Sequence, residues 1–533
     1  MNPRIRTEWL LLIGLCLFLF FYGLGRFGLV GADEPRYAQV AREMLANHDW
    51  VTPRLGGHAW LEKPPLYYWQ AMIAFALFGV SDWAARLPAA VDASLIVVGV
   101  LLFLRRLRPG FHFDGAFMVA SAAGVVGFAH AAATDMPLAA MFTLAMLAWY
   151  AWWETHNRWL LAAFYAFLAL GTLAKGPVAP FLAALIVILF AIAAHDGRIV
   201  LKTLWPPGLL AFFVVALPWY VMVQVRNPEF FRVFILEHNL ARFGTNLYRH
   251  QQPFWFFVPV ALLALIPWTV FVAAAAYEIA RAWWAERKAL FASGDAFNFF
   301  LLLWLIVPVI FFSLSQSKLP GYILPAIPAG PMLVAEYVRR HASAEERPGK
   351  WLVGAHALVA VSPIVPALLI QHLLILHRLT VGKALIGASV FALVLAGLLI
   401  MMLNGKPGLR LLRSATLIPV LLSVALLMKL GAPALDATAS ARPVAEELRR
   451  LDPRPLPVAV FALHRETEYG LAFYRNQVIH NYEGVPLWDE HLLIAPEGTQ
   501  ILLGKLLGDR HVEFLGSYPP QRLDFYRVAE EGK

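Results

Sequence analysis

The chain has 533 residues, of which 60% are hydrophobic and 15% are charged. Soluble domains carry about 25% charged residues, so this composition excludes an ordinary soluble protein. The formal net charge of +9 does not indicate nucleic-acid binding, because excess Lys and Arg in a membrane protein mostly lie in cytoplasmic loops. The single cysteine, Cys16, excludes an internal disulfide.

Apolar runs of about 18 or more residues recur along most of the chain, which is typical of a polytopic α-helical membrane protein. The first run follows MNPRIRTEW and ends in charged residues instead of a small-residue cleavage site, so we expect an uncleaved first helix. The sequence predicts about 13 transmembrane helices. They lie near residues 9–29, 84–104, 113–133, 136–153, 159–174, 177–194, 204–224, 254–277, 297–314, 322–338, 351–371, 382–402 and 414–431.

The apolar runs stop near residue 432. Beyond it, PVAVFAL, TQILLG and HVEFLG are typical of short strands, and residues 442–451 are typical of a helix. We therefore expect a transmembrane domain over residues 1–431 and a small soluble α/β domain over residues 432–533.

The loops between the predicted spans form two alternating sets. One set is mostly short and basic, and the positive-inside rule makes it cytoplasmic. The N-terminus belongs to this set, and an odd number of spans places the C-terminus on the other side. The outward set contains loops 30–83 and 225–253, the turns near 134–135, 175–176 and 315–321, the loop near 372–381, and the C-terminal domain.

Ionisable residues gather in the outward set. Such groups at membrane depth are costly and usually functional, so their presence on one side predicts a site there. They are Asp33, Glu34, Glu62, Lys63, Asp135, Lys175, Glu237, His238, His250 and Lys318.

The segment GADEPRYAQVAREML, residues 31–45, places Asp33 and Glu34 just after the first span. An Asp at a helix start caps backbone N–H groups, and Pro35 suits a first helical turn. Capping explains one acid but not two, so we expect this pair to act in a functional site.

The segment LEKPPLYYW, residues 61–69, combines a charge pair, two prolines and an aromatic cluster. The aromatic residues alone are typical of an interfacial belt. Lys63 could bind a phosphate as a compact point charge, and we expect that role.

Two further outward turns carry charged side chains. Asp135 lies in HAAATDMP, where it or Thr134 could instead cap the next helix. Lys175 lies in AKGP, where a snorkelling interfacial lysine is the simpler interpretation. Lys318 and Tyr322 lie in SLSQSKLPGYILP, which we interpret as a shaped anion site.

One outward loop supplies two histidines, His238 in LEHNLARF and His250 in RHQQP. Two imidazoles and a carboxylate suit Zn²⁺, and Glu62 is the acid we nominate as third ligand. Hydrogen-bonded structural histidines are an equally good interpretation, because the spacing is wide.

In chain order, seven of these segments resemble a known family. They are DEPRYA from Asp33, REML from Arg42, LEKPP from Leu61, AKG from Ala174, EHNLARF from Glu237, PFWFFVP from Pro253 and SKLPGYILP from Ser317. Together they resemble the family of the lipid A aminoarabinose transferase, which is related to the protein O-mannosyltransferases among the membrane glycosyltransferases of the GT-C fold. The resemblance runs over about residues 9–340; beyond that it rests on general layout.

The resemblance implies a donor, undecaprenyl phosphate carrying 4-amino-4-deoxy-L-arabinose, and an acceptor, a phosphate of lipid A. It implies inverting transfer on the periplasmic face of the bacterial inner membrane and no nucleotide cofactor. One departure is Pro65, where the enterobacterial enzymes have a small apolar residue. Close relatives transfer other sugars, so the reaction is better indicated than the sugar.

The resemblance also implies roles for individual residues. It places Asp33 and Asp135 at two acidic positions of the catalytic site, and we add Glu34 because it is paired with Asp33 in the chain. It implies phosphate binding by Lys63 and Lys318, a donor site shaped by Tyr322, and a divalent metal at Glu62, His238 and His250. From their charge we also expect Arg36, Lys175 and Arg242 to bind substrate or phosphate.

The acceptor decides what Asp33 does. A hydroxyl acceptor needs a general base, whereas a phosphate with a second pKa near about 6 is already anionic. With a hydroxyl acceptor, Asp33 is therefore the base. With a phosphate acceptor, Asp33 positions a cation such as Arg36 or contacts the sugar.

Three other functions fit parts of the pattern. A polyprenyl-lipid transporter would need charges deep in the spans, and the candidate charges lie on one side only. A non-catalytic binding protein would not need acids, lysines and aromatics in so many separate outward loops. A protein or glycan O-glycosyltransferase with a polyprenyl-phosphate donor remains the main alternative.

Overall fold

The computed structural model describes residues 3–241, 252–285, 296–342, 348–375, 382–405, 408–482, 487, 489–508 and 510–529. Within these residues, eight helices are long and apolar enough to cross a membrane, or up to ten if two bent pairs are counted. They are Asp82–Leu107 (α4), Asp135–Thr155 (α7), Arg158–Lys175 (α8), Pro206–Arg226 (α11), Ala296–Ser313 (α16), Lys350–Gln371, Lys383–Asn404 (α20) and Gly408–Ala439. The sixth comprises α18 (Lys350–Val361) and most of α19 (Ile364–Leu374), and the last begins with η4 (Gly408–Leu411) and α21 (Leu412–Leu426). Each falls on a predicted span, which confirms a polytopic helical chain.

The other five predicted spans are broken or short, so the count of 13 is not confirmed. Two are the pairs α5 (His112–Ala120) with α6 (Ala123–Ala129), bent by 58°, and α13 (Phe257–Ala264) with α14 (Thr269–Ala285), bent by 113°. The other three are α9 (Val178–Ala193), α1 (Pro3–Cys16) with η1 (Leu17–Phe21), and η3 (Pro320–Ala326) with α17 (Ala329–His341).

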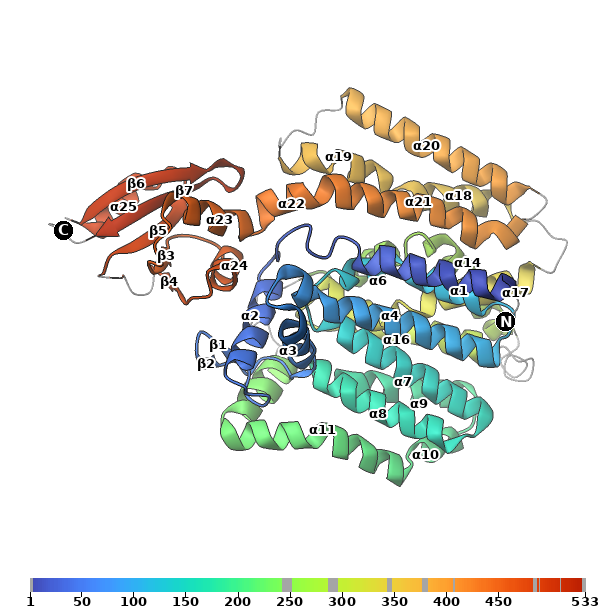
Figure 1. The fold of residues 1–533 in the computed structure, drawn as a ribbon. Helices are drawn as coiled ribbons and strands as arrows, with labels where there is room; N and C mark the ends of the chain where they lie inside the picture. The colour runs from blue at the N-terminus through green and yellow to red at the C-terminus, as the bar shows by residue number, and fades with distance from the viewer. Residues whose placement is uncertain are drawn as a thin grey trace.

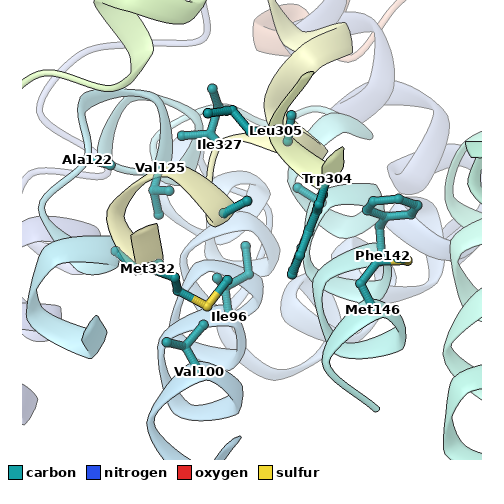
Figure 2. Packing of buried hydrophobic residues seen from close by; sticks show 14 of the residues in the cluster. Ile96, Val100, Ala122, Val125, Phe142, Met146, Trp304, Leu305, Ile327 and Met332 are labelled. Carbon is teal, nitrogen blue, oxygen red and sulfur yellow. The ribbon is translucent and has the colours of Figure 1, made fainter. Parts of the chain in front are cut away.

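Buried apolar side chains fill the centre of the bundle, where α4, α6, α7, α16 and α17 meet (Figure 2). Trp304 lies edge-on to Phe142, with ring centroids 6.2 Å apart. Its indole N–H donates to the carbonyl of Pro325 at 2.8 Å, which satisfies the one polar atom of a fully buried ring. This core holds α7 and η3, whose ends carry candidate site residues, in fixed positions.

One end of the bundle carries short elements that lie outside the long spans (Figure 1). They are α2 (Asp33–Ala46), the hairpin β1 (Arg54–Leu55) and β2 (His58–Ala59), α3 (Leu66–Phe78) and η2 (Phe231–Ala241). The short α10 (Arg198–Thr203) lies at the opposite end of α11. Helix α2 buries Tyr37, Val40, Ala41 and Met44, a helical spacing that turns one face toward α3.

The last span continues as helix through η5 (Leu427–Gly431) and α22 (Ala432–Ala439), past the predicted boundary at residue 431. A helix of 32 residues is about 48 Å long at about 1.5 Å per residue, which exceeds the roughly 30 Å hydrocarbon core of a bilayer. The helix is thus longer than a span requires, and its C-terminal end leads into the C-terminal region (Figure 1).

The C-terminal region is a five-stranded sheet in the order β4-β3-β5-β7-β6, parallel across β4, β3 and β5 and antiparallel across the rest. The strands are Val458–Val460 (β3), Ile479–Asn481 (β4), His491–Pro496 (β5), His511–Tyr518 (β6) and Leu523–Ala529 (β7). The helices are α23 (Arg442–Leu451), α24 (Arg465–Arg475) and α25 (Gln500–Leu507). The predicted helix at 442–451 and the strands in PVAVFAL and HVEFLG are confirmed, whereas a strand in TQILLG was wrong, because these residues form α25.

Candidate active site

Asp33 begins helix α2 with its side chain 50% exposed. The N-cap of this helix is Ala32, so Asp33 does not cap it as the alternative interpretation required. Its carboxylate instead accepts a hydrogen bond from the guanidinium of Arg36, one turn further on, at 2.5 Å. The structure thus presents a half-exposed acid whose orientation is fixed by a largely buried cation.

Arg36 lies against three aromatic rings. Its guanidinium carbon is 5.1 Å from the ring centroids of Tyr37 and Trp60 and 5.5 Å from that of Tyr469 in α24. Burial acts to lower the pKa of Arg36, but the nearby Tyr37, Asp33 and Glu62 raise it above its usual range. Arg36 therefore stays charged beside Asp33, and it connects α2 to the C-terminal region.

Glu34 has different surroundings from those expected of a catalytic acid. It is 6% exposed, and both carboxylate oxygens face Arg86 of α4, at 3.1 Å from Nε and 2.6 Å from Nη2. The same carboxylate accepts the backbone N–H groups of Val30 and Ala132 at 2.8 Å. A carboxylate enclosed by protein donors is placed to hold the chain, so this geometry favours a structural role for Glu34 over direct contact with substrate.

Asp135 begins α7 and pairs with Lys175, the last residue of α8, with 2.5 Å between Oδ1 and Nζ. The Lys175 ammonium also lies 4.8 Å from the ring centroid of Tyr322. A Cβ on Gly321 would come within 2.4 Å of Asp135 Oδ1, so a glycine lets η3 approach this acid closely. Three predicted site residues from three separate segments are therefore together.

Lys318 is 6% exposed, and its ammonium donates to the carbonyl of Ser315 in its own turn at 2.5 Å. The shaped turn is present, since Ser315 Oγ also donates to the carbonyl of Ser317 at 3.0 Å. A phosphate contact by Lys318 stays a prediction.

The predicted metal ligands are placed only in part. Glu62 Oε1 and His238 Nε2 lie 3.8 Å apart. His250 and Arg242 lie outside the residues that the structure describes. In the described part of the chain, no three His, Cys, Asp or Glu side chains come together as a metal site, so the Zn²⁺ site stays untested. Lys63 lies beside Glu62 and is half-buried.

The comparison with known proteins decides the family. A model of the dolichyl-phosphate-mannose-protein mannosyltransferase family matches residues 62–221. The chain is 31% identical over 406 residues to an undecaprenyl phosphate-alpha-4-amino-4-deoxy-L-arabinose arabinosyl transferase of Pseudomonas fluorescens, covering 74% of this chain and 67% of that one.

This chain belongs to the aminoarabinose arabinosyl transferase family.

A second relative, the enzyme of that name from Pseudomonas aeruginosa, is 32% identical over 332 residues. The matched part spans only 58% of that relative's length. The crystal structure of ArnT from Cupriavidus metallidurans bound to undecaprenyl phosphate has a TM-score of 0.77 at 22% identity, over 98% of both chains. This likeness shows that the chain has a polytopic helical fold of the GT-C type, as the sequence predicted.

Several residues that shape the site in this family member were missed from the sequence. Arg86 lies inside the predicted span 84–104, and an arginine there was itself a signal of function. Tyr469 and Tyr474 of α24 gave no local signal, because their partners lie more than 380 residues earlier in the chain.

Proposed function

We propose that this chain transfers 4-amino-4-deoxy-L-arabinose from undecaprenyl phosphate to a phosphate of lipid A. The named activity of its relatives supports this proposal. The structural observation that carries it is the pairing of two acids with two cations, Asp33 with Arg36 and Asp135 with Lys175, at one end of a membrane bundle. We place that end, with the C-terminal domain, on the periplasmic face of the bacterial inner membrane, and the N-terminus in the cytoplasm.

The reaction forms a bond between an acceptor phosphate oxygen and the anomeric carbon, and it breaks the bond from that carbon to the donor phosphate. The electron pair of the broken bond leaves with undecaprenyl phosphate, so negative charge grows on its oxygens. Cations held in a site with little water stabilise that charge. We give this role to Lys175, Lys63 and Arg36, with Lys318 and Arg242 as further candidates.

Asp33 has a role that depends on the acceptor. A lipid A phosphate is anionic and gives up no proton in the transfer, so Asp33 then holds Arg36 in position for the substrate. A hydroxyl acceptor would pass its proton to Asp33 as general base. The match of residues 62–221 to a protein mannosyltransferase family favours protein O-glycosylation as the second candidate function.

A transfer assay with the purified full chain tests the proposal. The chain is mixed with synthetic undecaprenyl phosphate aminoarabinose and either lipid A or a serine- and threonine-rich peptide. Product on lipid A supports the proposal. Product on the peptide alone supports the second candidate, and no product with any acceptor contradicts both.

Replacing Lys175 by methionine is expected to lower transfer about 10- to 100-fold. The change removes a charge-assisted hydrogen bond of about 1.5–3 kcal/mol and leaves the Asp135 carboxylate without its ammonium partner. The control is Lys202→Met, since Lys202 is exposed in α10, far from this site. Equal activity of both variants in the transfer assay would contradict the role of Lys175.

We also propose that Glu62, His238 and His250 bind a divalent metal such as Zn²⁺. A metal there would neutralise phosphate oxygens as a Lewis acid. Metal analysis of the purified protein is expected to find about one equivalent of zinc, and His238→Ala is expected to remove it. Zinc that stays bound to His238→Ala, or protein that is purified active without metal, would contradict the site.

A further inference from the structure

Arg86 is fully buried near the start of α4, and all three nitrogen atoms of its guanidinium donate hydrogen bonds. Apart from its two bonds to Glu34, Nη1 donates to the carbonyls of Leu24 and Phe27 at 2.8 and 2.7 Å, and Nη2 donates to that of Gly28 at 2.9 Å. One side chain of a spanning helix therefore fixes the segment that leads from the first helix to Asp33.

Glu34 extends this connection to the second acidic turn. While one of its oxygens accepts the N–H of Val30, the other accepts the N–H of Ala132, three residues before Asp135. Glu34 is next to Asp33 in the chain. A single carboxylate thus joins the backbone that carries Asp33 to the backbone that carries Asp135.

A buried ion pair is weak evidence for a stabilising role. The cost of removing both charges from water offsets most of their attraction, and apolar pairs of similar volume are often equally stable. A carboxylate with a fixed set of donors does set distances, because each hydrogen bond has a narrow range of length and angle. The arrangement of Arg86 and Glu34 is therefore better explained by positioning than by stability.

We propose that Glu34, held by Arg86, is a positioning residue that sets the separation of Asp33 and Asp135 across the active site. This inference rests on the proposed function, since it assumes that both acids act in one transfer reaction. It assigns to Glu34 no contact with substrate.

The test uses Glu34→Asp in the full-length protein. Aspartate keeps the charge but is one methylene shorter, so it cannot reach Arg86 and the Ala132 N–H together. A displacement of about 1 Å at a reacting centre costs up to about 100-fold in rate. We therefore expect kcat to fall about 10- to 100-fold while the KM for the donor changes less than about twofold.

The matched control is Glu154→Asp. Glu154 pairs with Arg108, which follows the other end of α4, with 2.8 Å between Oε1 and Nη2. This pair also joins α4 to another segment, but it lies far from Asp33 and Asp135. We expect Glu154→Asp to keep kcat within about threefold of wild type. An equal fall in kcat in both variants, or a kcat above half of wild type in Glu34→Asp, would overturn the proposal.

Arg86→Lys provides a second variant in case Glu34→Asp does not fold, since lysine keeps the charge but loses the guanidinium fork. The same fall in kcat at constant donor KM is expected. If neither variant accumulates as folded protein while Glu154→Asp does, the pair serves folding and the proposal is overturned.

Hydrogen exchange separates this proposal from the proposed function. Faster exchange of the peptide that contains Ala132 is expected in Glu34→Asp and not in Glu154→Asp, because only the first change frees that N–H. This readout needs no substrate. If the wild-type protein transfers no aminoarabinose, the proposed function is refuted, but the role of Glu34 in joining the two acidic turns can still be tested. If exchange at Ala132 is unchanged in Glu34→Asp, only that role of Glu34 is overturned.

Discussion

Asp33→Asn is expected to lower sugar transfer by at least about 100-fold. The change removes the charge that holds the Arg36 guanidinium at 2.5 Å, and it removes the only half-exposed acid at the start of α2. If the acceptor is a phosphate, Arg36 loses its orientation; if it is a hydroxyl, the base is lost. The rate of transfer from a labelled donor, measured with purified protein, checks this expectation.

An aspartate-to-asparagine substitution far from the site, Asp196→Asn, is the control. Asp196 accepts the backbone N–H of Arg198 at 3.0 Å at the start of α10, and asparagine can do the same. Asp196→Asn is therefore expected to keep wild-type activity. Wild-type activity in Asp33→Asn would show that the paired acid at α2 takes no part in the reaction.

Gly28→Ala is expected to weaken the packing of the C-terminal region against the membrane bundle. A Cβ at Gly28 would lie 2.1 Å from Ser440 Oγ, 2.6 Å from Tyr474 Oη and 2.9 Å from Arg442 Cβ. The backbone cannot move away, because its N–H donates to Asp436 at 2.7 Å and its carbonyl accepts from Arg86 at 2.9 Å.

The weakened packing would affect the site as well as stability. Tyr474 donates to Asp82 and accepts the N–H of Leu29, both at 2.6 Å, so α24 holds the segment that leads to Asp33. Crowding of this kind costs about 1–3 kcal/mol. We expect a lower melting temperature, faster protease cleavage near residue 440 and reduced transfer.

Gly14→Ala is the matched control for Gly28→Ala, since nothing lies within 4 Å of a Cβ at Gly14. It is expected to leave the melting temperature and the cleavage pattern unchanged. The close contact at Gly28 would be disproved if the two alanine variants melted and were cleaved alike.

Hydropathy predicted the membrane architecture because the bilayer requires long apolar helices, a property that local sequence carries. Hydropathy gave too many unbroken membrane spans where helices bend or shorten. At Ala120–Ala123 and Ala264–Thr269 two helices meet within one apolar run, and the composition of the run does not show the break. In the C-terminal region TQILLG was mistaken for a strand, because a short apolar run fits either element.

The candidate site was predictable to the extent that charges on one side of a membrane are unusual. Charge predicted Asp135 and Lys175 on one side of the membrane, and the SLSQSKLPGYILP segment added Tyr322; the structure brings all three together. Charge could not separate Asp33 from Glu34, because their difference comes from partners remote in sequence. Glu34 meets Arg86 across 52 residues and Ala132 across 98, contacts that no local pattern encodes.

The mass of lipid A in living cells shows whether this chain adds a sugar to lipid A. A strain lacking this protein is compared with the same strain expressing the wild-type chain or Asp33→Ala. We expect an added aminopentose on lipid A that depends on the wild-type chain and is absent with Asp33→Ala. Lipid A of the same mass in all three strains would contradict lipid A as the acceptor.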